Sequence, residues 1–71
     1  MTLNQFRLLS EPEQEEIVTD RGLYLINYVQ GDIMCDVYKM DSFYVKFCHD
    51  LRKNKKPSLI ILGDKTEFYF V

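Results

Sequence analysis

The stretch GLYLINYVQGDIMCDVYKMDSFYVKFCH, from Gly22 to His49, decides the fold of this chain. It contains three runs of apolar, β-branched and aromatic residues, separated by the dipeptides Gly31-Asp32 and Asp41-Ser42. Each dipeptide is typical of the two-residue loop of a β-hairpin. The sequence therefore predicts an antiparallel meander of three strands across this stretch.

The register of the meander follows by counting outward from the two turns. The first hairpin is expected to have the pairs Gln30–Ile33, Val29–Met34, Asn27–Asp36, Leu25–Tyr38 and Leu23–Met40. The second hairpin is expected to have the pairs Met40–Phe43, Tyr38–Val45 and Asp36–Phe47. A slip of one residue in either turn would move one strand's side chains to the opposite faces.

Side chains alternate between the two faces of a strand, so the register also predicts which face forms the core. The predicted core face is largely apolar and collects Leu23, Leu25, Val29, Met34, Tyr38, Met40, Phe43, Val45 and Phe47. The opposite face is mixed and rich in tyrosine, and it collects Tyr24, Ile26, Tyr28, Ile33, Cys35, Val37, Lys39, Tyr44, Lys46 and Cys48.

Two short helices are predicted before the meander. Thr2 with Gln5 three residues later is a candidate capping box, and apolar residues at helical spacing follow up to Leu9. The run Ser10-Glu11-Pro12-Glu13 is a second capping box, with proline in the first turn of its helix. Gly22 is a natural end for this second helix.

Two further strands are predicted after a Lys-rich loop that follows His49. Ser58 to Leu62 is β-branched and bounded by proline and glycine, and Thr66 to Val71 follows a third turn signal at Gly63-Asp64. We therefore predict a single α+β domain over residues 1–71. Two short N-terminal helices pack on an antiparallel sheet of about five strands, which can curl into a half-barrel.

Composition places the chain among small intracellular proteins. It has 71 residues, 46% of them hydrophobic, and a net charge of −2, so no global charge draws it to nucleic acid or membrane. No apolar run approaches the roughly 18 residues that span a bilayer. The N-terminus turns acidic where a signal peptide would be apolar. We therefore expect a cytoplasmic protein.

Few residues could support catalysis, and none of them forms a known motif. The two cysteines, Cys35 and Cys48, are expected to be reduced cross-strand neighbours, with a disulfide as the alternative. Cys48 and His49 are adjacent on a strand and so point to opposite faces, which prevents a nucleophile–base contact. The chain has only one histidine and no phosphate-binding glycine loop. We expect no enzyme activity, no cofactor and no metal site.

Two surfaces are candidates for a partner. The first is the tyrosine-rich sheet face, which suits a protein partner or a homo-oligomer and consists of Tyr24, Tyr28, Lys39, Tyr44 and Lys46. The second is the basic loop, which could contact nucleic acid together with that face and contains Arg52, Lys53, Lys55 and Lys56. Because the net charge is negative, we favour a protein-interaction module over a nucleic-acid-binding protein.

The order of these features resembles a family of small uncharacterised bacterial proteins of the Bacteroidetes type. The resemblance rests on the opening TLNQF at Thr2–Phe6 with LSE soon after, on the helix that ends at Gly22 before a strand and a Gly-Asp turn, and on the run VYKMDSFYV at Val37–Val45. It spans roughly residues 2–49, and the chain departs from the family pattern after them. The resemblance implies no catalytic or binding residue, because no function is established for the family.

Overall fold

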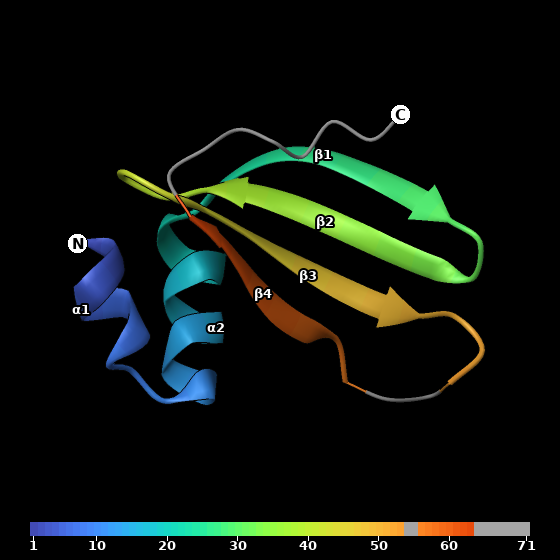
Figure 1. The fold of residues 1–71 in the computed structure, drawn as a ribbon, viewed down its shortest axis with the longest axis horizontal. Coiled ribbons are helices and arrows are strands. Elements are labelled where there is room, and N and C mark those ends of the chain that lie inside the picture. The colour runs from blue at the N-terminus through green and yellow to red at the C-terminus, as the bar shows by residue number, and fades with distance from the viewer. Residues whose placement is uncertain (54–55, 64–71) are drawn as a thin grey trace.

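The computed structural model describes residues 1–53 and 56–63 and shows two helices followed by an antiparallel sheet (Figure 1). The helices are α1 (Leu3–Arg7) and α2 (Glu11–Arg21), and the strands are β1 (Leu23–Gln30), β2 (Ile33–Lys39), β3 (Tyr44–Asp50) and β4 (Ser58–Gly63). The sheet has the order β1-β2-β3-β4, so β1 and β4 are its edges among the described strands. The α+β class is confirmed.

The predicted sheet of about five strands is confirmed only for four of them. Within the described residues the sheet is an open meander, with β1 and β4 at its two edges. The predicted fifth strand, Thr66 to Val71, lies outside the described residues.

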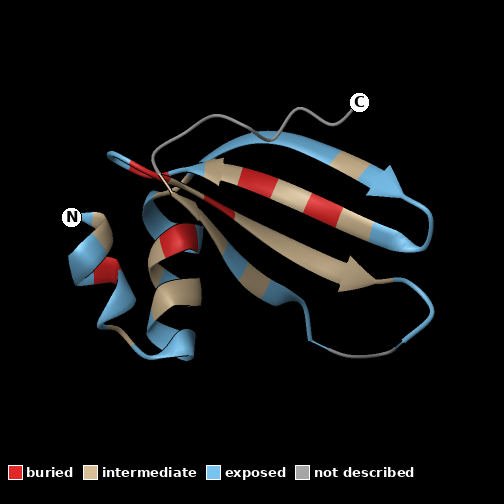
Figure 2. Ribbon diagram, in the orientation of Figure 1, coloured by how far each residue is buried: buried red, intermediate tan, exposed pale blue. Residues whose placement is uncertain are grey.

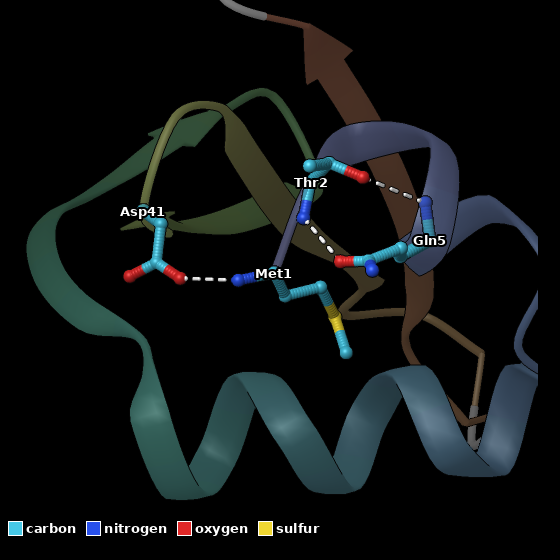
Figure 3. Close-up of polar contacts among 4 residues, drawn as sticks. All are labelled: Met1, Thr2, Gln5 and Asp41. Atoms are coloured by element: carbon cyan, nitrogen blue, oxygen red, sulfur yellow. Dashed lines mark hydrogen bonds and ion pairs between the residues drawn. The ribbon is translucent and has the colours of Figure 1, made fainter.

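Both helices begin with the predicted capping boxes. The backbone N–H of Gln5 donates to Thr2 Oγ1 at 3.1 Å, and the backbone N–H of Thr2 donates to Gln5 Oε1 at 2.8 Å (Figure 3). Ser10 and Glu13 form the same reciprocal pair at α2, and hydrogen bonds from Ser10 lower the pKa of Glu13. α1 ends at Arg7, two residues earlier than predicted. Its N-terminal side is tied to the second turn by the Met1 amino group, which lies 2.8 Å from Asp41 Oδ2.

Gly22 ends α2 as predicted, but for a different reason. Its φ of −73° is open to any residue, so a left-handed cap is not what requires glycine here. A Cβ atom on Gly22 would instead lie 2.6 Å from the carbonyl oxygen of Val18 and 3.3 Å from the Tyr38 ring. Glycine therefore allows the close approach of α2 and the sheet at the point where β1 begins.

The register predicted near the two turns is confirmed. Gly31 adopts a φ of 64°, and the first hairpin pairs Gln30 with Ile33, Val29 with Met34 and Asn27 with Asp36. The second hairpin pairs Tyr38 with Val45 and Asp36 with Phe47. The backbone N–H of Met40 donates to the carbonyl of Phe43 at 2.8 Å, which closes the second turn.

The core lies at one end of the sheet, where both helices pack (Figure 2). Its buried members come from both helices and from the second hairpin, and they are Phe6, Val18, Met40, Phe43 and Val45. The ring centroids of Phe6 and Phe43 lie 5.0 Å apart. Tyr38, Phe47 and Ile17 pack against this cluster, as the predicted core face requires.

The predicted core face is wrong for its β1 members. Leu23, Leu25 and Val29 are exposed, and Met34 is only half-buried. The two helices are short and lie near the second turn, so they cover only part of the face (Figure 1). An edge strand that no described helix covers stays open to solvent on both faces.

Candidate interaction surface

The largest group of exposed apolar side chains in the described residues lies along β1. We call it the β1 patch, and it consists of Leu23 (61% exposed), Tyr24 (50%), Leu25 (39%), Ile26 (37%) and Val29 (57%). Among the described strands β1 pairs only with β2, so its outer edge has no strand neighbour. The patch thus combines exposed apolar side chains with backbone groups on an open edge.

A bulge in β1 changes the face of Tyr24. Tyr24 pairs with Tyr38 and Ile26 pairs with Val37, so Leu25 is the extra residue of the bulge. The predicted pairs Leu25–Tyr38 and Leu23–Met40 are therefore wrong. So is the placement of Tyr24 on the face of Tyr28.

Tyr24 instead packs on the face that carries Asp36 and Tyr38. Its hydroxyl donates to Asp36 Oδ1 at 3.4 Å, and its ring lies edge-on to Tyr38 with centroids 5.4 Å apart. Desolvation and the charge of Asp36 raise the pKa of Tyr24. Asn27 Nδ2 also donates to Asp36 Oδ1, at 2.8 Å. The carboxylate therefore joins two β1 side chains to β2.

The register places the other four residues of the predicted tyrosine-rich face together. Lys39 lies opposite Tyr44, Lys46 lies opposite Val37, and Tyr28 lies opposite Cys35. Lys46 Nζ donates to the Tyr28 hydroxyl at 3.3 Å. Burial raises the pKa of Tyr28. Burial works against the charge of Lys46, but the hydrogen bond to Tyr28 and the nearby cysteines raise its pKa overall. At neutral pH the pair is an ammonium group bound to a neutral phenol.

This second face is more buried than its composition suggests. Val37 and Cys35 on β2 are buried, whereas Tyr28, Tyr44 and Lys46 are half-buried and Lys39 is exposed. The burial of Val37 was not predicted from the sequence. Its burial could have been expected because Val37 belongs to β2, which lies between two paired strands in the predicted meander.

The two cysteines lie opposite each other as predicted and are both free thiols. Burial, followed by the hydrogen bond with Cys35, raises the pKa of Cys48 to about 11. Such a thiol carries little thiolate at neutral pH, so Cys48 is a poor nucleophile. His49 lies opposite Met34, on the other face from Cys48, which confirms that the adjacent pair cannot act together.

Two cations of the basic loop, Arg52 and Lys56, form ion pairs with carboxylates of the same chain. Arg52 Nε lies 3.1 Å from Asp32 Oδ2 and 4.0 Å from Asp50 Oδ1, and Lys56 Nζ lies 3.0 Å from Glu15 Oε1. Lys53 is exposed, and Lys55 lies outside the described residues. These ion pairs join the loop to the turn between β1 and β2, to the end of β3 and to α2.

One cleft opens between α2 and the sheet, with a volume of about 270 Å³. It is lined by Glu15, Thr19, Asp36, Tyr38, Phe47, Lys56 and Pro57. Glu15 Oε2 is buried there without a hydrogen-bond partner in the described structure, although Oε1 of the same carboxylate pairs with Lys56. Within residues 1–53 and 56–63, no cluster of three or more histidine, cysteine or carboxylate side chains could hold a metal ion.

Comparison with known proteins adds no relative: no family model, no curated protein and no solved structure matches the chain. In the part of the chain that the structure describes, no helix is both long and apolar enough to cross a membrane.

Proposed function

We propose that this chain is a non-enzymatic, cytoplasmic protein-interaction module that contacts its partner through the β1 patch. The observation that carries the proposal is that β1, which has no charged residue, is exposed at seven of its eight positions. Edge strands of monomeric proteins are usually protected by charges, proline or a covering element. An apolar strand left open at an edge marks an interaction site.

The cytoplasmic part of the proposal is supported by the cysteines. Cys35 and Cys48 face each other on adjacent strands and are both free thiols. Free thiols that are cross-strand neighbours suit a reducing compartment. Membership of the uncharacterised bacterial family stays a prediction.

The proposed contact lies beside the four residues of the predicted tyrosine-rich face that the register keeps together, which are Tyr28, Lys39, Tyr44 and Lys46. Tyr28 belongs to β1, so a partner on the β1 patch also approaches Lys46 through its hydrogen bond to Tyr28. The half-burial of Tyr28 and Tyr44 makes that face the smaller contributor. Replacing both tyrosines by alanine should therefore weaken a β1 partner less than a charge placed within the β1 patch.

The test is affinity capture of proteins from a host lysate with matched variants. Val29→Lys places a charge in the β1 patch, and Leu8→Lys places the same charge on a still more exposed leucine at the end of α1. Val29→Lys should lower the amount of protein that is retained at least about tenfold, which corresponds to a loss of about 1.4 kcal/mol in binding free energy. The retained amount should be unchanged with Leu8→Lys. Retention that is equal for all three chains would overturn the proposal.

Nucleic-acid binding is the alternative, and the ion pairs of the basic loop weaken it. Arg52 and Lys56 are held by Asp32 and Glu15, which compete with phosphate groups. A mobility-shift titration with a single-stranded oligonucleotide of about 20 residues tests the alternative. Binding that falls steeply with salt and is lost in the Arg52→Ala, Lys53→Ala double variant would establish nucleic-acid recognition in place of a protein contact.

A further inference from the structure

β1 has the properties of a strand that pairs with another strand outside the described sheet. Its sequence LYLINYVQ contains no charged residue and no proline, and all its residues except Tyr28 are exposed. Within the described residues the bulge at Leu25 is the one protective feature found along β1, and it leaves Ile26–Gln30 in regular pairing with β2. A regular, uncharged edge of this kind is a template for β-strand addition.

We propose that the strand added to this edge is β1 of a second copy of the chain, in antiparallel orientation. Two four-stranded sheets then join into one continuous sheet across a two-fold axis. The inference rests on the proposed function and names the partner. β1 of a second copy suits this edge because the exposed apolar residues lie along the whole length of the strand and each copy presents the same ones.

The charges that flank β1 support the antiparallel orientation. Arg21 precedes the strand and Asp32 follows it, and both side chains are well exposed. Antiparallel pairing brings Arg21 of each copy toward Asp32 of the other, whereas parallel pairing brings like charges together. Asp32 already lies 3.1 Å from Arg52 and Arg21 lies 3.9 Å from Asp20. The flanking charges therefore set orientation more than affinity.

The size of the contact sets the expected strength of the dimer. Stable interfaces bury about 1,200–2,000 Å² in total, and weaker encounters bury less. The contact proposed here consists of one eight-residue strand from each copy, which places it among the smaller interfaces. We therefore expect a dissociation constant on the order of 10 μM, which lies within the range of sedimentation experiments.

Sedimentation velocity of the full chain between about 1 μM and about 1 mM tests the proposal, since this range brackets the expected dissociation constant. The wild type should pass from the monomer mass of 8.5 kDa to twice that mass. Val29→Lys should remain monomeric, and Leu8→Lys should follow the wild type. Far-UV circular dichroism of each variant at the lowest concentration checks that the fold is kept.

A second pair of variants tests the antiparallel orientation of the two β1 strands. Arg21→Glu places a negative charge near Asp32 of the second copy and should weaken the dimer about threefold to tenfold, because the two-fold axis repeats this exposed charge contact at both ends. Arg7→Glu makes the same change at the end of α1 and should have no effect. Equal weakening by both variants would overturn the antiparallel pairing.

Two results would overturn the dimer itself. One is a wild type that stays monomeric at the highest concentration, and the other is equal dimerisation of Val29→Lys and Leu8→Lys. If the wild type is monomeric yet Val29→Lys loses a captured protein, the second copy is the wrong occupant and the proposed function stands. If the capture experiment also shows no loss, the proposed function fails as well.

Discussion

β1 is less polar than β3, yet it is the more exposed of the two strands. β1 has no charged residue, yet seven of its eight residues are exposed and only Tyr28 is half-buried. β3 contains Lys46, His49 and Asp50, yet none of its residues is fully exposed. β3 lies between β2 and β4, whereas β1 is an edge. Position in the sheet, rather than composition, decides burial here.

The two strands also differ in how much they contribute to the buried core. The start of β3 lies under the two helices and contributes Val45 to the core, next to Phe43. β1 contributes no member of the buried cluster. Substitutions near the start of β3 should therefore affect stability, and substitutions in β1 should affect association.

The largest effect is expected at Phe43, immediately before β3. Its side chain is fully buried against the Phe6 ring, so Phe43→Ala should lower the free energy of unfolding by about 3–5 kcal/mol. A domain of this size has little stability to spare, so we expect this variant to be largely unfolded. Phe43→Leu keeps most of the volume and should cost about 1–2 kcal/mol. Urea denaturation followed by circular dichroism measures both. A stable Phe43→Ala protein would show that the core lies elsewhere.

The same substitution in both strands tests the comparison directly. Val45→Ala in β3 removes buried methyl groups and should cost about 1.5–3 kcal/mol. Val29→Ala in β1 removes exposed ones and should change stability by less than about 0.5 kcal/mol. Urea unfolding at about 1 μM, where the proposed dimer is dissociated, measures both. Equal costs would contradict the assignment of β1 as a solvent-exposed edge.

The sequence predicted local features that depend on a few neighbouring residues. The caps at Thr2 and Ser10, the turns at Gly31-Asp32 and Asp41-Ser42, and the pairings next to them are all confirmed. Each depends on short-range hydrogen bonding or on the backbone freedom of glycine, which the residue types specify.

Two long-range features of the candidate surface could not be predicted in this way. The bulge at Leu25 lies in a run without glycine, and a bulge residue near the right-handed helical region can be of any type. It moved Tyr24 away from the predicted tyrosine-rich face. The exposure of Leu23 and Val29 depends on strand order and on helix length, and no periodicity in β1 reports either of these.

The glycines at the two ends of β1 should respond differently to substitution. Gly22 lacks space for a Cβ atom, so Gly22→Ala should cost about 1–2 kcal/mol through the contact with the Val18 carbonyl. Gly31 has open space but a φ of +64°, so Gly31→Ala should cost about 1 kcal/mol through backbone strain. Asparagine tolerates positive φ, so Gly31→Asn should be milder than Gly31→Ala. Gly22→Asn should be no milder than Gly22→Ala. Thermal unfolding of the four variants measures the order. An asparagine that relieved both sites alike would contradict the distinction between them.

Thiol reactivity compares the two strands without any change in the core. Burial and the hydrogen bond with Cys35 raise the pKa of Cys48 from 9.0 to about 11. At pH 8 its thiolate population, and with it the rate of alkylation by iodoacetamide, should be about a hundredfold lower than for an ordinary thiol. A cysteine introduced by Val29→Cys in exposed β1 should react at the ordinary rate within the same protein. Mass spectrometry of peptides after timed alkylation measures both sites.

The raised pKa of Cys48 also predicts how the free energy of unfolding changes with pH. Above pH 9 the unfolded chain loses the Cys48 proton, while the folded chain keeps it up to about pH 11. The unfolded state then binds fewer protons, so the contribution of this group to stability is complete below pH 9 and is lost as the pH rises through 11. Cys48→Ser should flatten this part of the unfolding curve, and Val29→Cys should leave it unchanged. Rapid alkylation of Cys48 at pH 8, at the rate of the introduced β1 cysteine, would show that β3 is as open to solvent as the edge.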